Sequence, residues 1–250
     1  MEDDEIIPSP TPSPPRKDEK KMRSIKSWKT VLVEGNIGCG KSTFLNYFKK
    51  YSNVTVLAEP VGKWTDVMGY NALELMYKDA PRWSCAFQFL VTLSMLEHHK
   101  LPEKPYSVKM MERSIYSARH CFIENLKQNS IMPDVDHSIL TAWHNWVDVN
   151  EDVQVDLIVY LRATPEVCAN RIKTRNRSEE SGVPIEYLKA LHVLHDDWLL
   201  HNKRGKLPAP VLVINADKGL EDLQQEIEGL SQDILLDLLP YRDNQEEECR

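Results

Sequence analysis

The chain has 250 residues, 42% of them hydrophobic, and a formal charge of −7 at pH 7. Its length suits one α/β domain, and its acidic balance argues against a surface that binds nucleic acid. No apolar run is long enough to span a membrane, and five cysteines without a CxxC pair or a secretory signal indicate free thiols in a reducing compartment.

The two ends of the chain differ in composition from the rest. Residues 1–29 are rich in proline, serine and charged side chains, which predicts a disordered tail. Residues 2–5 are all acidic, whereas mitochondrial transit peptides are rich in arginine and poor in acids. We therefore expect a cytoplasmic protein without a cleaved import signal, and the basic residues 17–23 leave a nuclear signal as the alternative. Residues 241–250, which include several acidic side chains, are expected to form a second tail.

Between these tails, short apolar strands alternate with helices over residues 30–240. The first strand, residues 30–33, leads through a glycine-rich turn into a helix over residues 41–51. Further strands are expected over 54–58, 108–111, 155–162 and 211–214, and further helices over 81–99, 114–127, 134–149, from 164 onward, 185–202 and 220–239. Strands joined by helical crossovers run parallel, so the sequence predicts one α/β domain with a five-stranded parallel sheet and helices on both faces.

The turn after the first strand carries a phosphate-binding motif. It matches the pattern GxxxxGK followed by serine or threonine, with a strand before it and a helix after it. Its glycines let backbone N–H groups turn toward a phosphate, and the helix N-terminus adds partial positive charge. Lys41 is placed to reach the β- and γ-phosphates, and Ser42 to offer a hydroxyl to Mg²⁺. The predicted ATP-binding residues are Gly35, Asn36, Ile37, Gly38, Cys39, Gly40, Lys41, Ser42 and Thr43.

A phosphate-binding turn alone does not separate a kinase from a GTPase switch protein. A GTPase would carry an Asn-Lys-x-Asp motif for guanine, and the nearest match, Asn202-Lys203-Arg204-Gly205, lacks the aspartate. A DxxG match at residues 66–69 follows no strand. The GTPase interpretation is therefore the weaker one, and the flanking strand and helix disfavour a chance glycine-rich turn.

Charged residues follow the second and third strands. Glu59 follows the strand at 54–58, and Glu112 and Arg113 follow the strand at 108–111. Ligand sites of open α/β sheets lie at the carboxyl ends of strands. Glu59 is therefore a candidate general base, and Arg113 a candidate charged partner for that base and the transferring phosphoryl group. Glu112 is a candidate ligand of Mg²⁺. An ordinary loop glutamate and a surface ion pair are the alternatives.

Basic residues gather after the fourth strand. Arg171, Arg175 and Arg177 crowd the end of a predicted helix and the loop beyond it. Such a run is most often a solvated helix face. The functional interpretation is an Arg-rich lid that neutralises charge on the transferring phosphoryl group. It would also supply local positive charge that an acidic protein otherwise lacks.

One helix face combines an amide with apolar side chains. Gln88, Val91 and Met95 share one side of a predicted helix. A buried glutamine needs hydrogen bonds, and its amide offers a donor and an acceptor, as the edge of a nucleobase does. Ala118 and Phe122, four residues apart on the next helix, suit a flat slot for a base. From spacing alone, ordinary core packing is the more frequent explanation of such positions.

Several short stretches between residues 30 and 200, taken together, are more specific for one protein family than any of them alone. They are Glu34-Gly35-Asn36-Ile37-Gly38-Cys39-Gly40-Lys41-Ser42, Glu59-Pro60-Val61-Gly62-Lys63-Trp64, Glu74-Leu75-Met76-Tyr77-Lys78-Asp79, Phe87-Gln88 with Val91-Thr92-Leu93-Ser94-Met95-Leu96, Met111-Glu112-Arg113-Ser114, Ser117-Ala118-Arg119-His120-Cys121-Phe122 and Arg175-Asn176-Arg177-Ser178-Glu179-Glu180. In these stretches the sequence resembles the deoxyribonucleoside kinase family, most of all its multisubstrate insect enzymes and mitochondrial-type thymidine kinases. Beyond residue 200 the resemblance thins.

The resemblance implies a P-loop kinase fold with an Arg-rich lid, ATP as phosphate donor, Mg²⁺ as cofactor and a homodimer. It implies Glu59 as the base on the 5′-hydroxyl and Arg113 as its partner. Lys41, Arg175 and Arg177 would contact the phosphates, and Ser42 and Glu112 would serve Mg²⁺. The residues implied to bind the nucleoside are Glu59, Trp64, Met76, Tyr77, Gln88, Val91, Met95, Arg113, Ala118, Phe122 and Glu180, with Tyr77 and Glu180 on the sugar 3′-hydroxyl.

The expected substrates follow from the size of this pocket. Val91 and Ala118 are uncharged and of modest size, which leaves room for a methyl group at the pyrimidine 5-position. Thymidine and deoxycytidine are therefore both expected to fit. Ser84-Cys85-Ala86 departs from the Met-Pro or Met-Ala type run that similar enzymes carry, which leaves the use of purine deoxynucleosides open.

Two rival functions remain to be weighed. A nucleoside monophosphate kinase would need extra positive groups for the acceptor's phosphate, which Glu59 would repel. A nucleotide-binding regulatory subunit would have lost its catalytic residues, whereas Glu59, Arg113 and the basic segment are present. We therefore predict an enzyme of nucleotide salvage that phosphorylates deoxyribonucleosides at the 5′-hydroxyl, without nucleic-acid or membrane partners.

Overall fold

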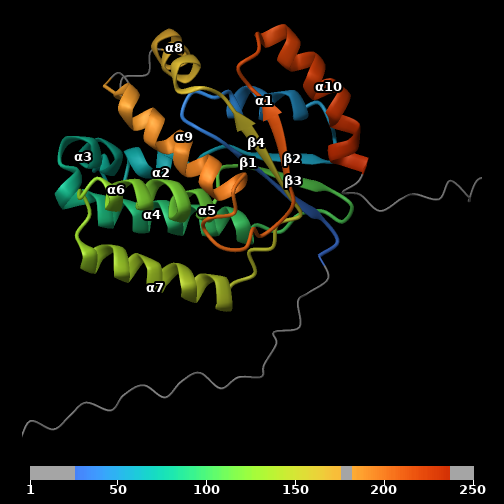
Figure 1. Cartoon of the computed structure of the whole chain (residues 1–250). Helices are drawn as coiled ribbons and strands as arrows, with labels where there is room; N and C mark the ends of the chain where they lie inside the picture. Colours follow the sequence, from blue (N-terminus) through green and yellow to red (C-terminus); the bar gives the residue numbers. More distant parts are fainter. Residues whose placement is uncertain (1–25, 176–181, 237–250) are drawn as a thin grey trace, which may run out of the picture.

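Five parallel strands form the central sheet of the computed structural model, which describes residues 26–175 and 182–236 (Figure 1). The strands are β1 (Lys29–Glu34), β2 (Val54–Leu57), β3 (Val108–Glu112), β4 (Leu157–Arg162) and β5 (Val211–Asn215). Their order is β2-β3-β1-β4-β5, with every neighbouring pair parallel. The predicted five-stranded parallel sheet is confirmed.

Helices α1 (Lys41–Phe48), α8 (Pro165–Arg175) and α10 (Leu220–Leu236) cover one face of this sheet. Side chains alternate between the faces of a strand, so Val31 and Val33 point to this side and pack into its hydrophobic cluster. Both are fully buried, as expected for a parallel sheet that helices cover on both faces.

The other face is covered by α9 (Ile185–Leu199) and by the helical segment that follows β3. Leu32, which lies between the two valines, points to this side and clusters with Trp198 of α9. Beyond this layer, α4 (Ala80–Lys100) packs against α7 (Asp134–Asn150), which lies at the outer edge of the molecule (Figure 1). The prediction of helices on both faces is therefore confirmed.

A buried lysine fixes the end of α4 to the sheet. The Nζ of Lys109 in β3 donates to the carbonyl oxygens of His98, His99 and Leu101, at 3.1, 2.8 and 2.8 Å. The first two carbonyls belong to the last turn of α4 and the third to its C-cap, where carbonyl groups lack N–H partners within the helix. Burial lowers the pKa of Lys109 to about 8. The contact anchors the helix that carries Gln88.

The segment after β3 is less regular than predicted. The single helix expected over 114–127 is divided into α5 (Ile115–Ser117), the π-helix η1 (Ala118–Ile123) and α6 (Glu124–Gln128). A π-helix shifts the hydrogen bonds by one residue, which apolar spacing does not reveal. The wider turn is placed beside the cavity described below, where such turns are frequent.

Two further helices were not predicted. They are α2 (Val61–Thr65) and α3 (Ala72–Lys78), and their five and seven residues are too few to show a helical period. Asn71 begins α3 by accepting a hydrogen bond from the backbone N–H of Glu74 at 2.9 Å. At the N-terminus, β1 begins at Lys29, one residue earlier than expected.

None of the described helices combines the length and the apolar character needed to cross a bilayer. Residues 1–25 and 241–250, on which the predictions of two tails and of cellular location chiefly rested, fall outside the described part of the chain.

Candidate active site

The turn between β1 and α1 has the backbone of a phosphate-binding loop. Gly35 and Gly38 have φ angles of +143° and +77°, which residues with a side chain rarely adopt. A Cβ atom on Gly35 would lie 2.5 Å from the carbonyl oxygen of Leu161, and one on Gly38 would lie 2.7 Å from that of Cys168. The loop is therefore packed against β4 and α8 more closely than any side chain would permit.

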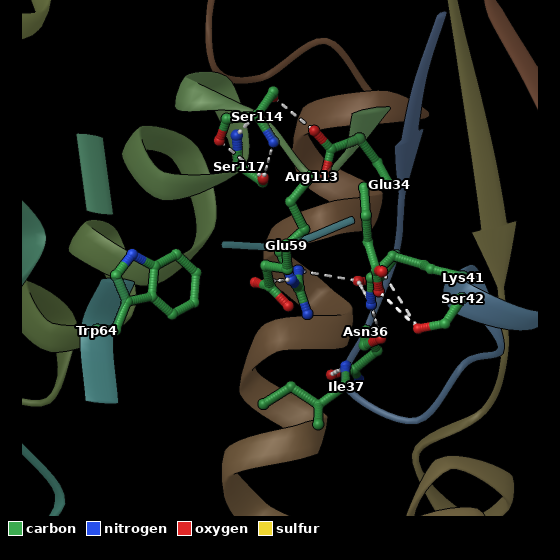
Figure 2. A network of polar contacts seen from close by, with 12 residues as sticks. Glu34, Asn36, Ile37, Lys41, Ser42, Glu59, Trp64, Arg113, Ser114 and Ser117 are labelled. Atoms are coloured by element: carbon green, nitrogen blue, oxygen red, sulfur yellow. Dashed lines mark hydrogen bonds and ion pairs between the residues drawn. The ribbon is translucent and has the colours of Figure 1, made fainter. Parts of the chain in front are cut away.

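The side chain of Lys41 lies over this loop (Figure 2). Its Nζ is 2.9 Å from the carbonyl oxygen of Asn36 and 3.4 Å from that of Gly35. The side-chain amide of Asn36 accepts from the N–H of Ile37 and donates to the carbonyl of Leu188, both at 2.8 Å. The loop thus holds an ammonium group beside its own turn, the arrangement that a bound polyphosphate needs.

Glu59 and Arg113 point toward each other at the carboxyl ends of β2 and β3 (Figure 2). Arg113 Nε is 3.0 Å from Glu59 Oε1, and Arg113 Nη1 donates to the carbonyl of Gly35 at 3.1 Å. Burial lowers the pKa of the Arg113 guanidinium, but the carboxylates of Glu59 and Glu34 outweigh that effect and raise it. The structure therefore brings a carboxylate and a fully charged guanidinium together above the phosphate-binding loop.

Two oxygen-bearing side chains, one from α1 and one from β3, contact each other beside the loop. Ser42 Oγ is 3.0 and 3.2 Å from the two carboxylate oxygens of Glu112. Hydroxyl and carboxylate oxygens are the ligands that Mg²⁺ prefers. Nowhere in the described residues do three His, Cys, Asp or Glu side chains gather as a metal site of their own. The pair fits a cation that is held jointly with a nucleotide's phosphates.

A cavity of about 600 Å³ runs from the loop to α4. A second cavity, of about 260 Å³, lies over the loop itself. Both are lined by Gly38, Lys41, Ser42, Glu112 and Arg175, so the two spaces meet at the phosphate-binding loop. Glu59 and Arg113 line only the larger one. The geometry can hold an organic acceptor and a polyphosphate on either side of one reacting point.

The far end of the larger cavity has the character of a nucleobase site. Gln88 is 4% exposed, and its amide oxygen finds no hydrogen-bond partner among the described residues. An unsatisfied buried acceptor costs about 1–3 kcal/mol, which a bound donor would recover. The indole of Trp64 is fixed by its hydrogen bond to Ser94 Oγ at 2.9 Å and packs edge-on against Phe87. The end wall is therefore rigid and mostly apolar.

Ala118 and Phe122 of η1 line the same cavity. Their neighbours Cys121 and Ile123 are buried in the core instead. The ring of Phe122 lies over the guanidinium of Arg113, whose Cζ is 4.7 Å from the ring centroid. One aromatic side chain thus contacts the guanidinium of the charged pair and borders the cavity.

The three predicted lid arginines have different positions. Arg171, on α8, donates to the carbonyls of Cys39, Ala216 and Lys218 at 3.2, 2.8 and 3.0 Å. It therefore braces the phosphate-binding loop against the loop after β5, and it also lines the smaller cavity. Arg175 ends α8 and lines both cavities. Arg177 lies outside the described residues.

Most of the predicted nucleoside and catalytic residues share the larger cavity. It is lined by Lys41, Ser42, Glu59, Trp64, Met76, Tyr77, Gln88, Val91, Met95, Glu112, Arg113, Ala118, Phe122 and Arg175. Thr43 and Gly40 line the smaller cavity, and Ile37 the larger one. Gly35, Asn36 and Cys39 line neither cavity, and the first two shape the loop through the contacts described above. Glu180 lies outside the described residues.

Sequence reasoning missed several lining residues. Leu73 comes from the unpredicted helix α3, and Tyr187 comes from α9, far along the chain. Burial raises the pKa of the Tyr187 hydroxyl well above its usual value. Ser114 and Ser117 were also missed, although a serine three residues before another serine at a helix start is a capping signal.

Comparison with known proteins gives a consistent result. Residues 31–238 match the family model described as deoxynucleoside kinase. Human mitochondrial thymidine kinase 2 is 47% identical over 215 residues, which cover 86% of this chain and 79% of that protein. Mouse deoxycytidine kinase is 36% identical over 228 residues, covering 80% of this chain and 88% of that protein. Deoxycytidine kinase 1 of Xenopus laevis is 35% identical over 231 residues, covering 81% and 87%.

Proposed function

Because this chain belongs to the deoxynucleoside kinase family, a family of P-loop kinases, it is an ATP-dependent deoxynucleoside kinase of nucleotide salvage, and we propose that thymidine and deoxycytidine are its acceptors. Phosphate is transferred to their 5′-hydroxyl, giving a deoxynucleoside monophosphate and ADP. The observation that carries the proposal is the pairing of Glu59 with Arg113 between the phosphate-binding loop and a cavity with an unsatisfied glutamine.

Glu59 acts as the general base in this proposal. The 5′-oxygen attacks the γ-phosphorus, the bond to the β,γ-bridging oxygen breaks, and the hydroxyl proton passes to Glu59. Arg113 orients the carboxylate through its Nε and stays charged throughout. Positioning and charge stabilisation then supply most of the rate enhancement, as is usual in phosphoryl transfer.

The phosphate end is assigned to the loop and to α8. Lys41 contacts the β- and γ-phosphates, and Arg175, which lines both cavities, contacts the transferring group. Arg177 is proposed to do the same from the segment beyond α8. Ser42 and Glu112 would hold Mg²⁺, which supplies positive charge to the phosphate oxygens.

The acceptor end is assigned to α2, α3, α4 and η1, together with Glu180. The amide of Gln88 reads the edge of the base, and Phe122 stacks on its face. Trp64, Met76 and Met95 form the walls, while Tyr77 and Glu180 hold the sugar 3′-hydroxyl. Val91 and Ala118 carry no charge, which leaves space for the 5-methyl group of thymine as well as for cytosine.

The test is a panel of kcat/KM values for thymidine, deoxycytidine, deoxyadenosine and deoxyguanosine, with ATP and Mg²⁺, and with the monophosphate product identified by mass. We expect both pyrimidines to be used with comparable efficiency. The Glu59→Gln variant is expected to bind thymidine but to lose at least about 100-fold in kcat, since general-base catalysis contributes about 10²–10⁴-fold. No turnover of either pyrimidine, or normal turnover by Glu59→Gln, would contradict the proposal.

The two rival functions find less support in the site. A monophosphate acceptor would bring its phosphate to the Glu59 carboxylate, which lines the cavity where that phosphate would sit. A nucleotide-binding subunit without catalysis would have no use for a base and a guanidinium held 3.0 Å apart. The substrate panel separates the proposed kinase from both rivals, because only the proposed kinase turns over deoxynucleosides.

We further propose that the chain forms a homodimer through α7 and the adjoining part of α4. Val135, Ile139, Trp146 and Val149 of α7 are between 47% and 75% exposed, and Leu93 of α4 is 51% exposed. Exposed apolar side chains grouped on packed helices are typical of association surfaces. Light scattering should give twice the monomer mass for the wild type, and the monomer mass for a Trp146→Glu variant.

A cytoplasmic location is also a proposal, supported by the composition of residues 2–5, all of them acidic. Human thymidine kinase 2 carries "mitochondrial" in its name, which makes the location worth testing directly. A fluorescent protein fused after residue 250 should give cytoplasmic or nuclear signal. Signal in mitochondria would contradict the proposal.

A further inference from the structure

Glu34 is a buried carboxyl group that the proposed mechanism does not use. It is the last residue of β1, directly before the phosphate-binding loop, and its exposure is 0%. A carboxyl group is costly to bury unless its surroundings give it partners. Its Oε1 accepts a hydrogen bond from Ser114 Oγ at 2.5 Å, and its Oε2 has no hydrogen-bond partner among the described residues (Figure 2).

The hydroxyl of Ser114 forms hydrogen bonds with its neighbours both as an acceptor and as a donor. Its oxygen accepts from the backbone N–H groups of Tyr116 and Ser117, at 3.1 and 3.4 Å, and so caps α5. The Ser117 hydroxyl accepts in return from the backbone N–H of Ser114 at 3.2 Å. A hydroxyl has a single hydrogen to donate, and that hydrogen is directed at Glu34. The rotamer of Ser114 is therefore set from both sides.

Ser114 directly follows Arg113, whose backbone is in an unfavourable conformation. The φ angle of Arg113 is +62°, in the left-handed region, which is unfavourable for a residue with a side chain. Such a conformation persists only where the surroundings impose it. The N–H of Arg113 donates to the carbonyl of Val33 at 3.0 Å, and the next residue is held by Glu34. Both restraints come from the end of β1.

The side chain of Arg113 starts from this restrained backbone. From it, Nε reaches Glu59 and Nη1 reaches the carbonyl of Gly35, the residue after Glu34. We propose that Glu34 is a positioning residue, which accepts the Ser114 hydrogen bond and thereby holds Arg113 in the geometry that orients the general base. The inference rests on the proposed roles of Glu59 and Arg113.

The hydrogen bond, rather than a formal charge, is the part of Glu34 that the proposal uses. Burial raises the pKa of Glu34 to about 7, although Ser114 and Arg113 act to lower it. A carboxyl group with that pKa is readily neutral, so the neutral amide of glutamine is a fair replacement for its acceptor oxygen. Leucine has a similar size but no acceptor.

The experiment compares Glu34→Leu, Glu34→Gln, Ser114→Ala and the Glu34→Leu/Ser114→Ala double variant with the wild-type chain. Glu34→Leu and Ser114→Ala are each expected to lower kcat about 10- to 100-fold, the usual effect of misplacing a reacting group slightly. The KM and Kd of thymidine should stay within about threefold, because Gln88 and Phe122 are untouched. Glu34→Gln should restore kcat to within about threefold of wild type, and the double variant should be no slower than either single one.

Glu124→Leu is the matched control. Its carboxylate is partly buried, whereas that of Glu34 is fully buried, and it accepts from His137 and Arg204, both at 2.9 Å, yet it lines neither cavity. It should lower the melting temperature without changing kcat. Should Glu34→Leu not fold, Ser114→Ala tests the same hydrogen bond from the other side.

A wild-type kcat in Glu34→Leu or Ser114→Ala would overturn the inference. So would a loss that Glu34→Gln fails to restore, or losses that multiply in the double variant. Wild-type turnover and Glu59→Gln are measured in parallel. An inactive wild type, or an active Glu59→Gln, would count against the proposed function instead.

Discussion

The ring of Phe122 packs over the guanidinium of Arg113, with Cζ of the arginine 4.7 Å from the ring centroid. A cation over an aromatic face gains about 0.5–2 kcal/mol, more when water is excluded. The side chain assigned to the base therefore also supports the partner of the general base.

The first prediction follows from this contact. Phe122→Leu should raise the KM of thymidine and also lower kcat by about fivefold, because both stacking and support of Arg113 are lost. Phe87→Leu is the comparison, since Phe87 lines the same cavity but packs on Trp64. Steady-state kinetics should show its effect mainly in KM. Equal kcat values for the two variants would refute a separate role of Phe122.

The second prediction concerns the choice between pyrimidines. Ala118 lines the cavity and is 2% exposed, so an aspartate there would place a charge close to the base. Ala118→Asp should lower kcat/KM for thymidine more than for deoxycytidine. Ala118→Asn, nearly the same size but uncharged, separates bulk from charge. Equal losses with both nucleosides would contradict the proposed position of the 5-methyl group.

The third prediction tests the brace between α8 and the phosphate-binding loop. Arg171→Ala removes hydrogen bonds to Cys39, Ala216 and Lys218, so the KM of ATP should rise about tenfold. Binding of thymidine, measured by calorimetry without nucleotide, should be unchanged. Lys173→Ala, an exposed change on the same helix, should alter neither value. A larger effect on thymidine than on ATP would speak against the brace.

The fourth prediction uses two glycines. Gly35→Ala should destabilise the fold by more than about 2 kcal/mol, because its Cβ would meet the backbone of Leu161 and its φ is positive. Gly229 is an exposed position in α10 with open space around it, so Gly229→Ala should stabilise the fold by about 0.5–1 kcal/mol. Urea denaturation measures both. Similar values for the two variants would show that close packing of the loop is unimportant.

The fifth prediction concerns acid stability. Burial lowers the pKa of His99 to about 3, and neither ring nitrogen has a hydrogen-bond partner among the described residues. Unfolding restores its ordinary pKa of about 6.5, so below that pH the unfolded chain binds a proton that the folded chain does not. The stability linked to His99 is therefore present above about pH 6.5 and falls by about 2 kcal/mol on going to pH 5.

The variant His99→Phe keeps an aromatic ring at this position but has no nitrogen that can be protonated. The difference in unfolding free energy between pH 7 and pH 5 should be smaller in the variant than in the wild type, by about 2 kcal/mol. Comparing the two chains cancels the opposite trend from Glu34, whose raised pKa favours the folded state as the pH falls from about 7 toward 4.5. Parallel pH profiles would show that His99 titrates normally in the fold.

The features that could be predicted from the sequence are those that residues close together in the chain define. The phosphate-binding loop depends on glycines within a few residues, and Glu59 and Arg113 stand directly after apolar strands. Because all strands are parallel, these strand ends meet at one edge of the sheet whatever their order. Two candidate residues could therefore be placed together before the order β2-β3-β1-β4-β5 was available.

The features that were missed depend on distant parts of the chain. The backbone contacts of Arg171 could not be predicted, because its targets, the carbonyls of residues 39, 216 and 218, carry no side-chain signal. Tyr187 reaches the cavity from a helix more than a hundred residues beyond the loop. The roles of Glu34 and Ser114 appear only when the end of β1 lies against the end of β3.

The wide turn of η1 limits how the enzyme could acquire new substrates. Within six residues it sends Ala118 and Phe122 into the cavity and Cys121 and Ile123 into the interior. Insertions or deletions in this stretch would exchange the two sets and damage packing and recognition together. We therefore expect variants that accept bulkier or chemically altered nucleosides, natural or evolved in the laboratory, to carry single substitutions. These substitutions should fall at Ala118 and at the facing positions on α4.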